Sequence, residues 1–171
     1  MSAEPKAEDK LLAARTGGVA EIVFNNPARH NAVSLEMWQR MSKLLAEFAA
    51  DEQVRVLVVS GAGGKAFVSG ADISKFESER ASAEAVGLYS ATSATAYGQL
   101  YNFPKPTIAK IQGYCIGGGV NLAVCCDLRY CTDDARFGIP AARLGLGYGY
   151  SGVHKLAEII GFLPRRRHGI R

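Results

Sequence analysis

The sequence predicts an α/β fold made of repeated strand–strand–helix units, because strand-like and helix-like segments alternate along the chain. Short apolar runs rich in β-branched residues are typical of strands, and longer stretches with apolar residues at helical spacing separate them. Several helices follow a pair of short strands rather than one strand. The chain has 171 residues, 48% of them hydrophobic and 21% charged, which fits one soluble globular domain with a substantial core.

The first elements are a hairpin and an amphipathic helix. "LLAART" (11–16) and "AEIVFN" (20–25) have the composition of two strands, joined by a turn at Gly17 and Gly18. Ser34 is placed to cap the helix that follows. Its apolar stripe consists of Leu35, Trp38, Met41, Leu44, Leu45 and Phe48. The run from Val54 to Gly61 is nearly all apolar and β-branched, which predicts a strand buried on both faces.

The remaining elements follow the same alternation. A Gly-rich loop (61–67) and the segment 68–76 lead to a helix from about Ala83 to Leu100. The later elements are a strand in "KPTIAKIQG" (105–113), a helix in 119–127, a strand in 128–132, an extended piece in 135–140 and a helix in 152–160.

The predicted domain organisation is a disordered lead-in (1–10), a folded core (11–161) and an atypical basic tail (162–171). The polar N-terminus has no signal-peptide core, and no apolar run reaches membrane-spanning length, so we expect a cytoplasmic protein. The tail carries Arg165, Arg166, Arg167 and Arg171, and removing them from the net charge of +4 leaves 4 − 4 = 0. A nucleic-acid face is therefore the weakest of the functions considered.

The cysteines and two glycine-rich loops indicate no metal or nucleotide site. Cys115, Cys125, Cys126 and Cys131 lack the paired spacing and nearby histidines of a zinc site, and we expect buried small hydrophobic residues. "GAGGKA" (61–66) and "GYGYSG" (147–152) match the spacing of the dinucleotide fingerprint. The first follows a strand but is not followed directly by a helix, and the second is not preceded by a strand, so neither has the context that a pyrophosphate site requires.

Two other bends could bind a negatively charged oxygen. Gly117 to Gly119 stand at the start of a predicted helix, where backbone N–H groups have no intrahelical partner. "SGAD" (69–72) is a second Gly-containing turn with the small residue Ala71. Amides from both bends could converge on one oxygen as an oxyanion hole, or both bends could be tight strand-to-helix turns only.

Four motifs in this sequence together resemble the crotonase (enoyl-CoA hydratase/isomerase) superfamily. They are "NNPARHNAVSLEMW" (25–38), "KAFVSGADISKF" (65–76), "KPTIAKIQGYCIGGGVNLAVCCDLRY" (105–130) and "ARFGIPAARLGLGYGYSG" (135–152). The resemblance runs from Leu11 to about Gly161. It implies the crotonase spiral of stacked strand–strand–helix units, homotrimers or hexamers, and a coenzyme A thioester as substrate, with no separate cofactor.

The resemblance also implies the roles of individual residues. The backbone amides of Ala71 and Gly118 would hold the thioester oxygen. Further substrate and CoA contacts would come from Arg29, His30, Ser69, Gly70, Asp72, Ile73, Gly117 and Ala141, with Tyr114 at an acyl-pocket position.

This chain departs from the hydratase pattern at two catalytic positions. Asn121 and Ala141 stand where hydratases of the family have glutamates. Adding water to an enoyl double bond needs a carboxylate, so standard two-glutamate hydration is doubtful, and Asn121 becomes a candidate for orienting a water or a substrate carboxylate. Other candidates are Asp127 and Asp72, for which structural and helix-capping roles are favoured, and Arg143, Tyr148, Tyr150 and His154.

The chain also ends early relative to the family pattern. After about Gly161 the family's C-terminal helices are expected, but "FLPRRRHGIR" resembles nothing in that region. Three hypotheses remain from the sequence: an acyl-CoA enzyme of lyase or isomerase type, a catalytically silent or truncated relative that binds acyl-CoA, and a nucleic-acid binder with a basic tail.

Overall fold

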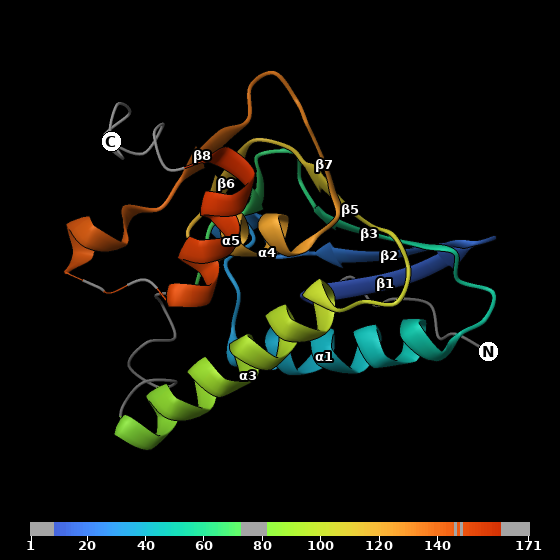
Figure 1. The fold of residues 1–171 in the computed structure, drawn as a ribbon, viewed down its shortest axis with the longest axis horizontal. Helices are drawn as coiled ribbons and strands as arrows, with labels where there is room; N and C mark the ends of the chain where they lie inside the picture. Colours follow the sequence, from blue (N-terminus) through green and yellow to red (C-terminus); the bar gives the residue numbers. More distant parts are fainter. Residues whose placement is uncertain (1–8, 73–81, 146, 148, 162–171) are drawn as a thin grey trace.

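The computed structural model describes residues 9–72, 82–145, 147 and 149–161. Two sheets form its frame (Figure 1). The larger has the strand order β1-β2-β3-β5-β7 and the smaller the order β4-β6-β8. β1 (Leu11–Thr16) and β2 (Val19–Phe24) are an antiparallel hairpin, as the sequence predicted. All other pairs of neighbouring strands are parallel.

Each pair of consecutive strands after the hairpin sends one strand to each sheet. β3 (Val56–Gly61), β5 (Thr107–Ile111) and β7 (Leu128–Cys131) extend the larger sheet. β4 (Ala66–Val68), β6 (Tyr114–Ile116) and β8 (Arg136–Gly138) form the smaller one. The predicted strand–strand–helix repeat is therefore confirmed, although the sequence predicted no strand at residues 66–68, which were expected in a Gly-rich loop, or at residues 114–116.

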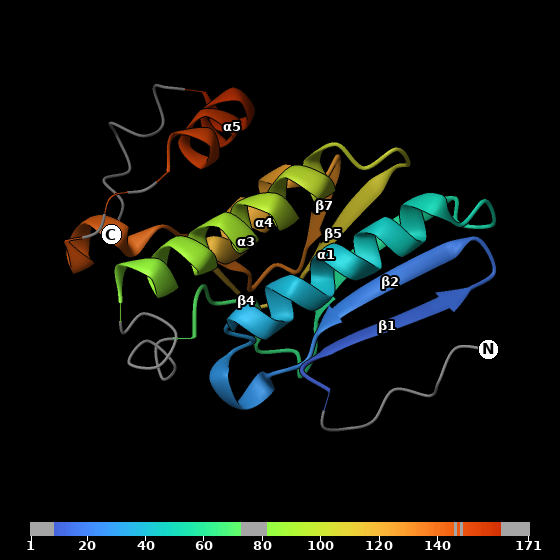
Figure 2. The ribbon, with the colours of Figure 1, turned by 90° about the horizontal axis from the view of Figure 1, so that it is seen from below.

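The helices follow these strand pairs. α1 (Leu35–Ala50) follows the hairpin and the short 3₁₀ turn η1 (Pro27–Arg29), and α3 (Ala83–Tyr101) follows β4. Figure 2 shows α1 and α3 side by side across the larger sheet. α4 (Gly118–Cys125) follows β6, and a 3₁₀ turn, η3 (Pro140–Leu144), and α5 (Tyr150–Ile160) follow β8.

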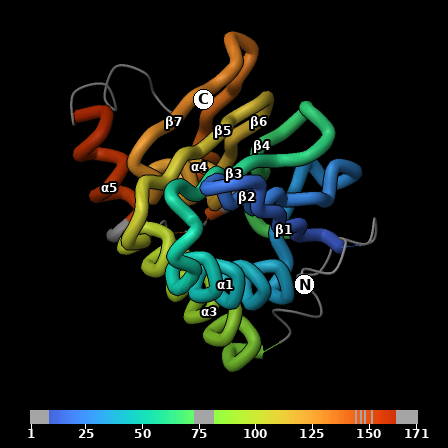
Figure 3. The backbone as a smooth tube through the Cα atoms, turned by 90° about the vertical axis from the view of Figure 1, so that its right-hand side faces the viewer, coloured from blue at the N-terminus to red at the C-terminus, as the bar shows by residue number. Residues whose placement is uncertain are grey.

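The core lies between the larger sheet and the helices on one of its faces (Figure 3). Trp38 and Met41 from the predicted stripe of α1 are buried there, and Ser34 caps the helix by accepting a hydrogen bond from the Met37 N–H. The expectation that residues 54–61 are buried on both faces is wrong. Val56 and Val58, which alternate with buried residues along β3, stay partly exposed because α1 and α3 cover only the other face.

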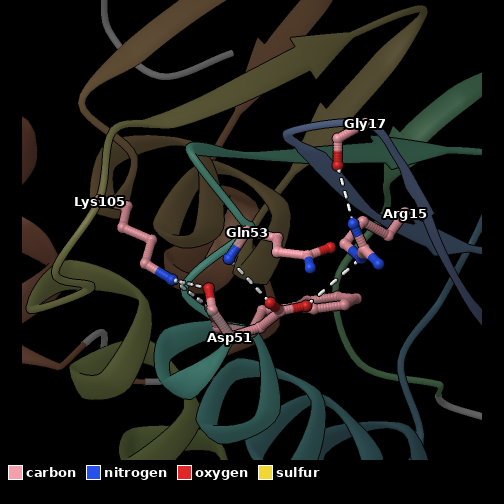
Figure 4. A network of polar contacts seen from close by, with 6 residues as sticks. Arg15, Gly17, Asp51, Gln53 and Lys105 are labelled. Carbon is pink, nitrogen blue, oxygen red and sulfur yellow. Dashed lines mark hydrogen bonds and ion pairs between the residues drawn. The ribbon is translucent and has the colours of Figure 1, made fainter.

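A polar network fixes the C-terminal end of α1 (Figure 4). The Asp51 carboxylate pairs with Arg15 of β1 at 3.3 Å and accepts the Gln53 N–H at 2.9 Å. The Lys105 ammonium, just before β5, donates to the Phe48 carbonyl at 2.8 Å and also to that of Asp51. The helix end is thereby tied to the hairpin and to the start of β5, and Lys105 satisfies the Phe48 carbonyl of its last turn.

The segments at the two chain ends lie largely outside the described residues. Of the predicted lead-in, Asp9 and Lys10 are described, and their carbonyls accept hydrogen bonds from Asn25. The basic tail 162–171 is not described. Among the described residues, no helix is long and apolar enough to cross a membrane.

Candidate functional site

The backbone around Ala71 is held by a parallel bridge to Val33. The Val33 N–H donates to the Gly70 carbonyl at 2.9 Å, and the Asp72 N–H donates to the Val33 carbonyl at 3.1 Å. In such a bridge the bonds are made by the residues on either side of Ala71, so the N–H of Ala71 faces the opposite edge. Within the described part of the chain, that N–H donates no hydrogen bond to the backbone.

The second bend begins α4 and consists of the three consecutive glycines. Gly117 is the N-cap and has φ 54° and ψ −113°, a conformation that glycine adopts far more readily than other residues. Its N–H donates to the Gly138 carbonyl at 2.8 Å, which ties the bend to β8. Gly118 is the first helical residue, and its N–H, like others in a first helical turn, has no intrahelical partner.

The two bends lie against each other beside the ends of the parallel strands β4 and β6. A Cβ placed on Gly70 would lie 3.8 Å from the Gly118 nitrogen, and one placed on Gly118 would lie 3.6 Å from the Gly70 Cα. Segments 47 residues apart in the sequence thus approach so closely that a single Cβ added to either glycine would touch the backbone of the other. The structure therefore brings the Ala71 and Gly118 segments together; their action on a ligand stays a prediction.

Tyr97, which sequence analysis did not select, also reaches this place. Its hydroxyl, on α3, donates to the Gly118 carbonyl at 3.2 Å. Its ring packs on that of Trp38 with centroids 4.9 Å apart. Nothing in the spacing of α3 distinguishes this tyrosine from Tyr89 or Tyr101, so only the folded contacts identify it.

Arg29, His30 and Ser69, the predicted CoA contacts, form a second group. The Ser69 N–H donates to the His30 carbonyl at 3.1 Å, and its hydroxyl donates to the Arg29 carbonyl at 3.3 Å. His30 has a left-handed φ of 51°, and its ring meets the edge of Tyr114 at 5.9 Å between centroids. The structure thus joins these residues through backbone contacts, with their charged or aromatic side chains exposed.

The His30–Tyr114 pair borders a shallow cavity of about 320 Å³. The other lining residues are Gly64, Lys65, Gly113, Asp134 and Arg136. Tyr114 is the first residue of β6, so this cavity lies at the opposite end of the smaller sheet from the bends at Gly70 and Gly118. Tyr114, expected in the acyl pocket, is 51% exposed and contacts His30.

The other candidates are placed as follows. Asn121 is half-buried in the first turn of α4, and Ala141 is half-buried in η3. Asp72 is buried beside the Val33 bridge, but the helix it was expected to cap, together with Ile73 and Tyr148, lies outside the described residues. His154 is on the exposed side of α5 and pairs with Glu158 at 3.5 Å. Arg143 and Tyr150 are exposed.

Asp127 has the structural role that was favoured for it. Its carboxylate accepts the Thr107 N–H at 2.7 Å and the Thr107 hydroxyl at 2.8 Å, and that hydroxyl accepts the Asp127 N–H at 2.8 Å. Thr107 begins β5 and is 1% exposed. Asp127 therefore sets the start of β7 against the start of β5.

Three of the four cysteines are buried as expected, and Cys131 is exposed on the edge strand β7, so the expectation is wrong for that residue. Burial raises the pKa of Cys115 and of Cys126 to about 12, so both thiols are protonated at neutral pH. Among the described residues, no group of His, Cys, Asp and Glu side chains could hold a metal ion.

Comparison with known proteins gives consistent similarities. The enoyl-CoA hydratase/isomerase family profile matches residues 14–166. A short-chain-enoyl-CoA hydratase of Clostridium acetobutylicum is 31% identical, covering 90% of this chain and 58% of the relative. The mitochondrial Delta(3,5)-Delta(2,4)-dienoyl-CoA isomerase of Mus musculus is 35% identical, covering 84% of this chain and 46% of the relative.

Solved structures agree with these relatives. An enoyl-CoA hydratase/carnithine racemase of Magnetospirillum magneticum superposes with a TM-score of 0.85 at 34% identity, covering 91% of this chain and 58% of that one. An enoyl-CoA hydratase of Bacillus anthracis gives 0.86 at 27% identity, with 93% and 61% covered. The chain therefore has the fold of these proteins and spans about half to three fifths of their length.

Proposed function

Because this chain belongs to the enoyl-CoA hydratase/isomerase family, we propose that it binds an acyl-CoA thioester and stabilises the enolate of that thioester. In this proposal the N–H groups of Ala71 and Gly118 form an oxyanion hole and donate to the thioester oxygen. Arg29, His30 and the segment Ser69 to Ile73 hold the CoA portion. Coenzyme A enters as part of the substrate.

The observation that supports this proposal is the close approach of two bare backbone bends. The Val33 bridge uses the groups on either side of Ala71, and Gly118 begins a helix, so within the described ranges neither N–H donates to a backbone carbonyl. Removing a proton next to a thioester carbonyl builds negative charge on its oxygen. Each preorganised donor aimed at that oxygen lowers the barrier by roughly 3–4 kcal/mol.

The reaction we propose is of lyase or isomerase type without the two-glutamate hydration mechanism. Asn121 follows Gly118 in the first turn of α4, and its side-chain amide can donate and accept hydrogen bonds but cannot exchange a proton at neutral pH. Ala141 has no polar group. Asn121 would therefore orient a water or a substrate carboxylate near the oxyanion hole.

Asn121 and Ala141, which cannot act as an acid or a base, also favour one alternative, a catalytically silent relative that binds acyl-CoA. Relatives of this chain bear names of hydratases and isomerases, which supports family-level enzyme activity. A homotrimer or hexamer and a cytoplasmic location stay predictions from the sequence.

One set of measurements separates these functions. Butyryl-CoA binding is measured by calorimetry, and turnover is measured with a panel of enoyl-, malonyl- and β-hydroxyacyl-CoA substrates, for the natural chain and for Asn121→Asp. Binding with product from one of the substrates supports the enzyme. Binding without product from any of them supports the silent relative, and no binding of butyryl-CoA would reject both.

A further inference from the structure

The Tyr97 hydroxyl stands directly beside the Gly118 backbone. A Cβ built on Gly118 would lie 2.9 Å from the Tyr97 Oη, closer than an ordinary van der Waals contact. The hydroxyl donates to the Gly118 carbonyl at 3.2 Å, and the residue is only half-buried. The hydroxyl therefore lies against the residue whose N–H is proposed to bind the thioester oxygen.

The distance between the two donors can be bounded from these contacts. A Cβ lies roughly 2.5 Å from the nitrogen of its own residue, so the Tyr97 Oη lies within about 5.4 Å of the Gly118 nitrogen. Hydrogen bonds of about 2.9 Å from each donor can span that separation and meet at one acceptor. The separation therefore allows one oxygen to lie within hydrogen-bonding distance of both donors.

The tyrosine is held rigidly by neighbouring aromatic residues. The Trp38 ring is 2% exposed and contacts the Tyr97 ring, and the Trp38 Nε1 donates to the Tyr89 hydroxyl at 3.0 Å. The Tyr89 hydroxyl in turn donates to the Val33 carbonyl at 2.9 Å, beside the Ala71 bridge. One tryptophan therefore supports two tyrosines, one bonded to Gly118 and the other to Val33, the bridge partner of Ala71. Such support holds groups in place before a substrate binds, as electrostatic stabilisation requires.

We propose that the Tyr97 hydroxyl is a third hydrogen-bond donor to the thioester oxygen. This inference rests on the proposed acyl-CoA function. As charge builds on that oxygen, the hydroxyl hydrogen turns about the Cζ–Oη bond from the Gly118 carbonyl toward the oxygen. The phenol keeps its proton throughout, so Tyr97 acts as a donor and not as a general acid.

The test uses the full chain, Tyr97→Phe and the control Tyr101→Phe. Tyr101 lies four residues further along α3 with its ring under the Lys155 ammonium, so the control makes the same chemical change on the same helix. The probe is butyryl-CoA labelled with ¹³C at the thioester carbonyl, whose resonance reports polarisation of the C=O bond. Exchange of the α hydrogens in D₂O, in which a buffer base accepts each α proton and the solvent supplies the deuterium, is measured in parallel.

We expect the natural chain and Tyr101→Phe to shift the bound carbonyl resonance downfield equally. In Tyr97→Phe the shift becomes smaller and exchange slows about 100-fold, while the dissociation constant rises by less than about tenfold. A merely structural tyrosine would leave the carbonyl shift of the bound probe unchanged.

Failure of this inference differs from failure of the proposed function. If the natural chain binds and polarises the probe and Tyr97→Phe matches it in carbonyl shift and exchange, the third donor is overturned while the oxyanion hole stands. If the natural chain does not bind the probe, the proposed function fails, and the Tyr97 inference fails with it. Should Tyr97→Phe not fold, 3-fluorotyrosine incorporated at residue 97 gives a stronger donor; an unchanged carbonyl resonance would then overturn the inference.

Discussion

Replacing Gly118 by proline removes one backbone N–H of the proposed oxyanion hole, and comparison with Gly118→Ala separates this loss from the effect of the added Cβ. Gly118 is the first residue of α4, the position at which helices accept proline because its N–H has no intrahelical partner. Gly117 before it has ψ −113°, which lies outside the helical region that proline disfavours in the preceding residue. The substitution is therefore compatible with the local backbone.

The expected decrease in the rate of α-hydrogen exchange is obtained by comparing Gly118→Pro with Gly118→Ala. Gly118→Ala and Gly118→Pro both add a Cβ, 2.9 Å from the Tyr97 Oη and 3.6 Å from the Gly70 Cα, so they disturb these neighbours in the same way. Only proline removes the donor and places ring carbon where the N–H had pointed. One such donor is worth roughly 3–4 kcal/mol, so proline should slow α-hydrogen exchange about 100-fold to 1,000-fold relative to alanine.

The assay is deuterium incorporation at the α carbon of butyryl-CoA, followed by proton NMR, with thermal unfolding as a check on folding. Both variants should unfold at similar temperatures. If the folded Gly118→Pro and Gly118→Ala variants exchange the α hydrogens of butyryl-CoA at rates within threefold of each other, the Gly118 N–H does not stabilise the enolate. The reasoning from the two bends would then be wrong.

Three further predictions concern the described structure outside the bends. Asp127→Ala should lower the free energy of unfolding by about 1–3 kcal/mol, measured by urea denaturation, because the buried Thr107 N–H loses its acceptor; an unchanged midpoint would contradict the structural role. A disulfide reagent should modify one thiol quickly in the native chain, and Cys131→Ser should abolish that fast phase. Stability should fall from about pH 9 toward pH 12, because Cys115 and Cys126 hold protons that the unfolded thiols release, their folded pKa values being about 12. The matched test is Cys126→Ala, whose unfolding free energy should depend less steeply on pH in that window.

The alternation of elements was predictable because each element carries its own local signal. The Ser34 cap and the stripe through Trp38 and Met41 define α1, and the β-branched run of β3 defines a strand. Burial was harder to predict for the strand. A run of apolar residues does not say how many faces are covered, and the partial exposure of Val56 and Val58 depends on which face α1 and α3 occupy. Cys131 was misjudged for the same reason, since only the strand order shows that β7 is an edge.

The candidate site was predictable only where its parts are backbone. Two glycine-containing turns can be predicted from a sequence, but their close approach depends on the pairing of β4 with β6, and neither strand was predicted. The Val33 bridge that turns the Ala71 N–H outward has no sequence signature. Tyr97 could not be predicted, because the apolar residues of α3 indicate only that the helix packs against the core.

The three consecutive glycines show how far a motif can be interpreted without its structure. Gly117 is required by its backbone conformation, with φ 54°. Gly119 is required by packing, because a Cβ there would lie 2.1 Å from the Val68 carbonyl oxygen of β4. Gly118 alone faces the other bend and the Tyr97 hydroxyl. In the sequence the three residues are equivalent, yet two of them position the third. Substitutions at Gly117 or Gly119 should displace α4 and therefore cannot test the proposed role of the Gly118 N–H. Only changes at Gly118 that keep the helix start intact, such as the proline and alanine pair, test whether its N–H acts on a substrate.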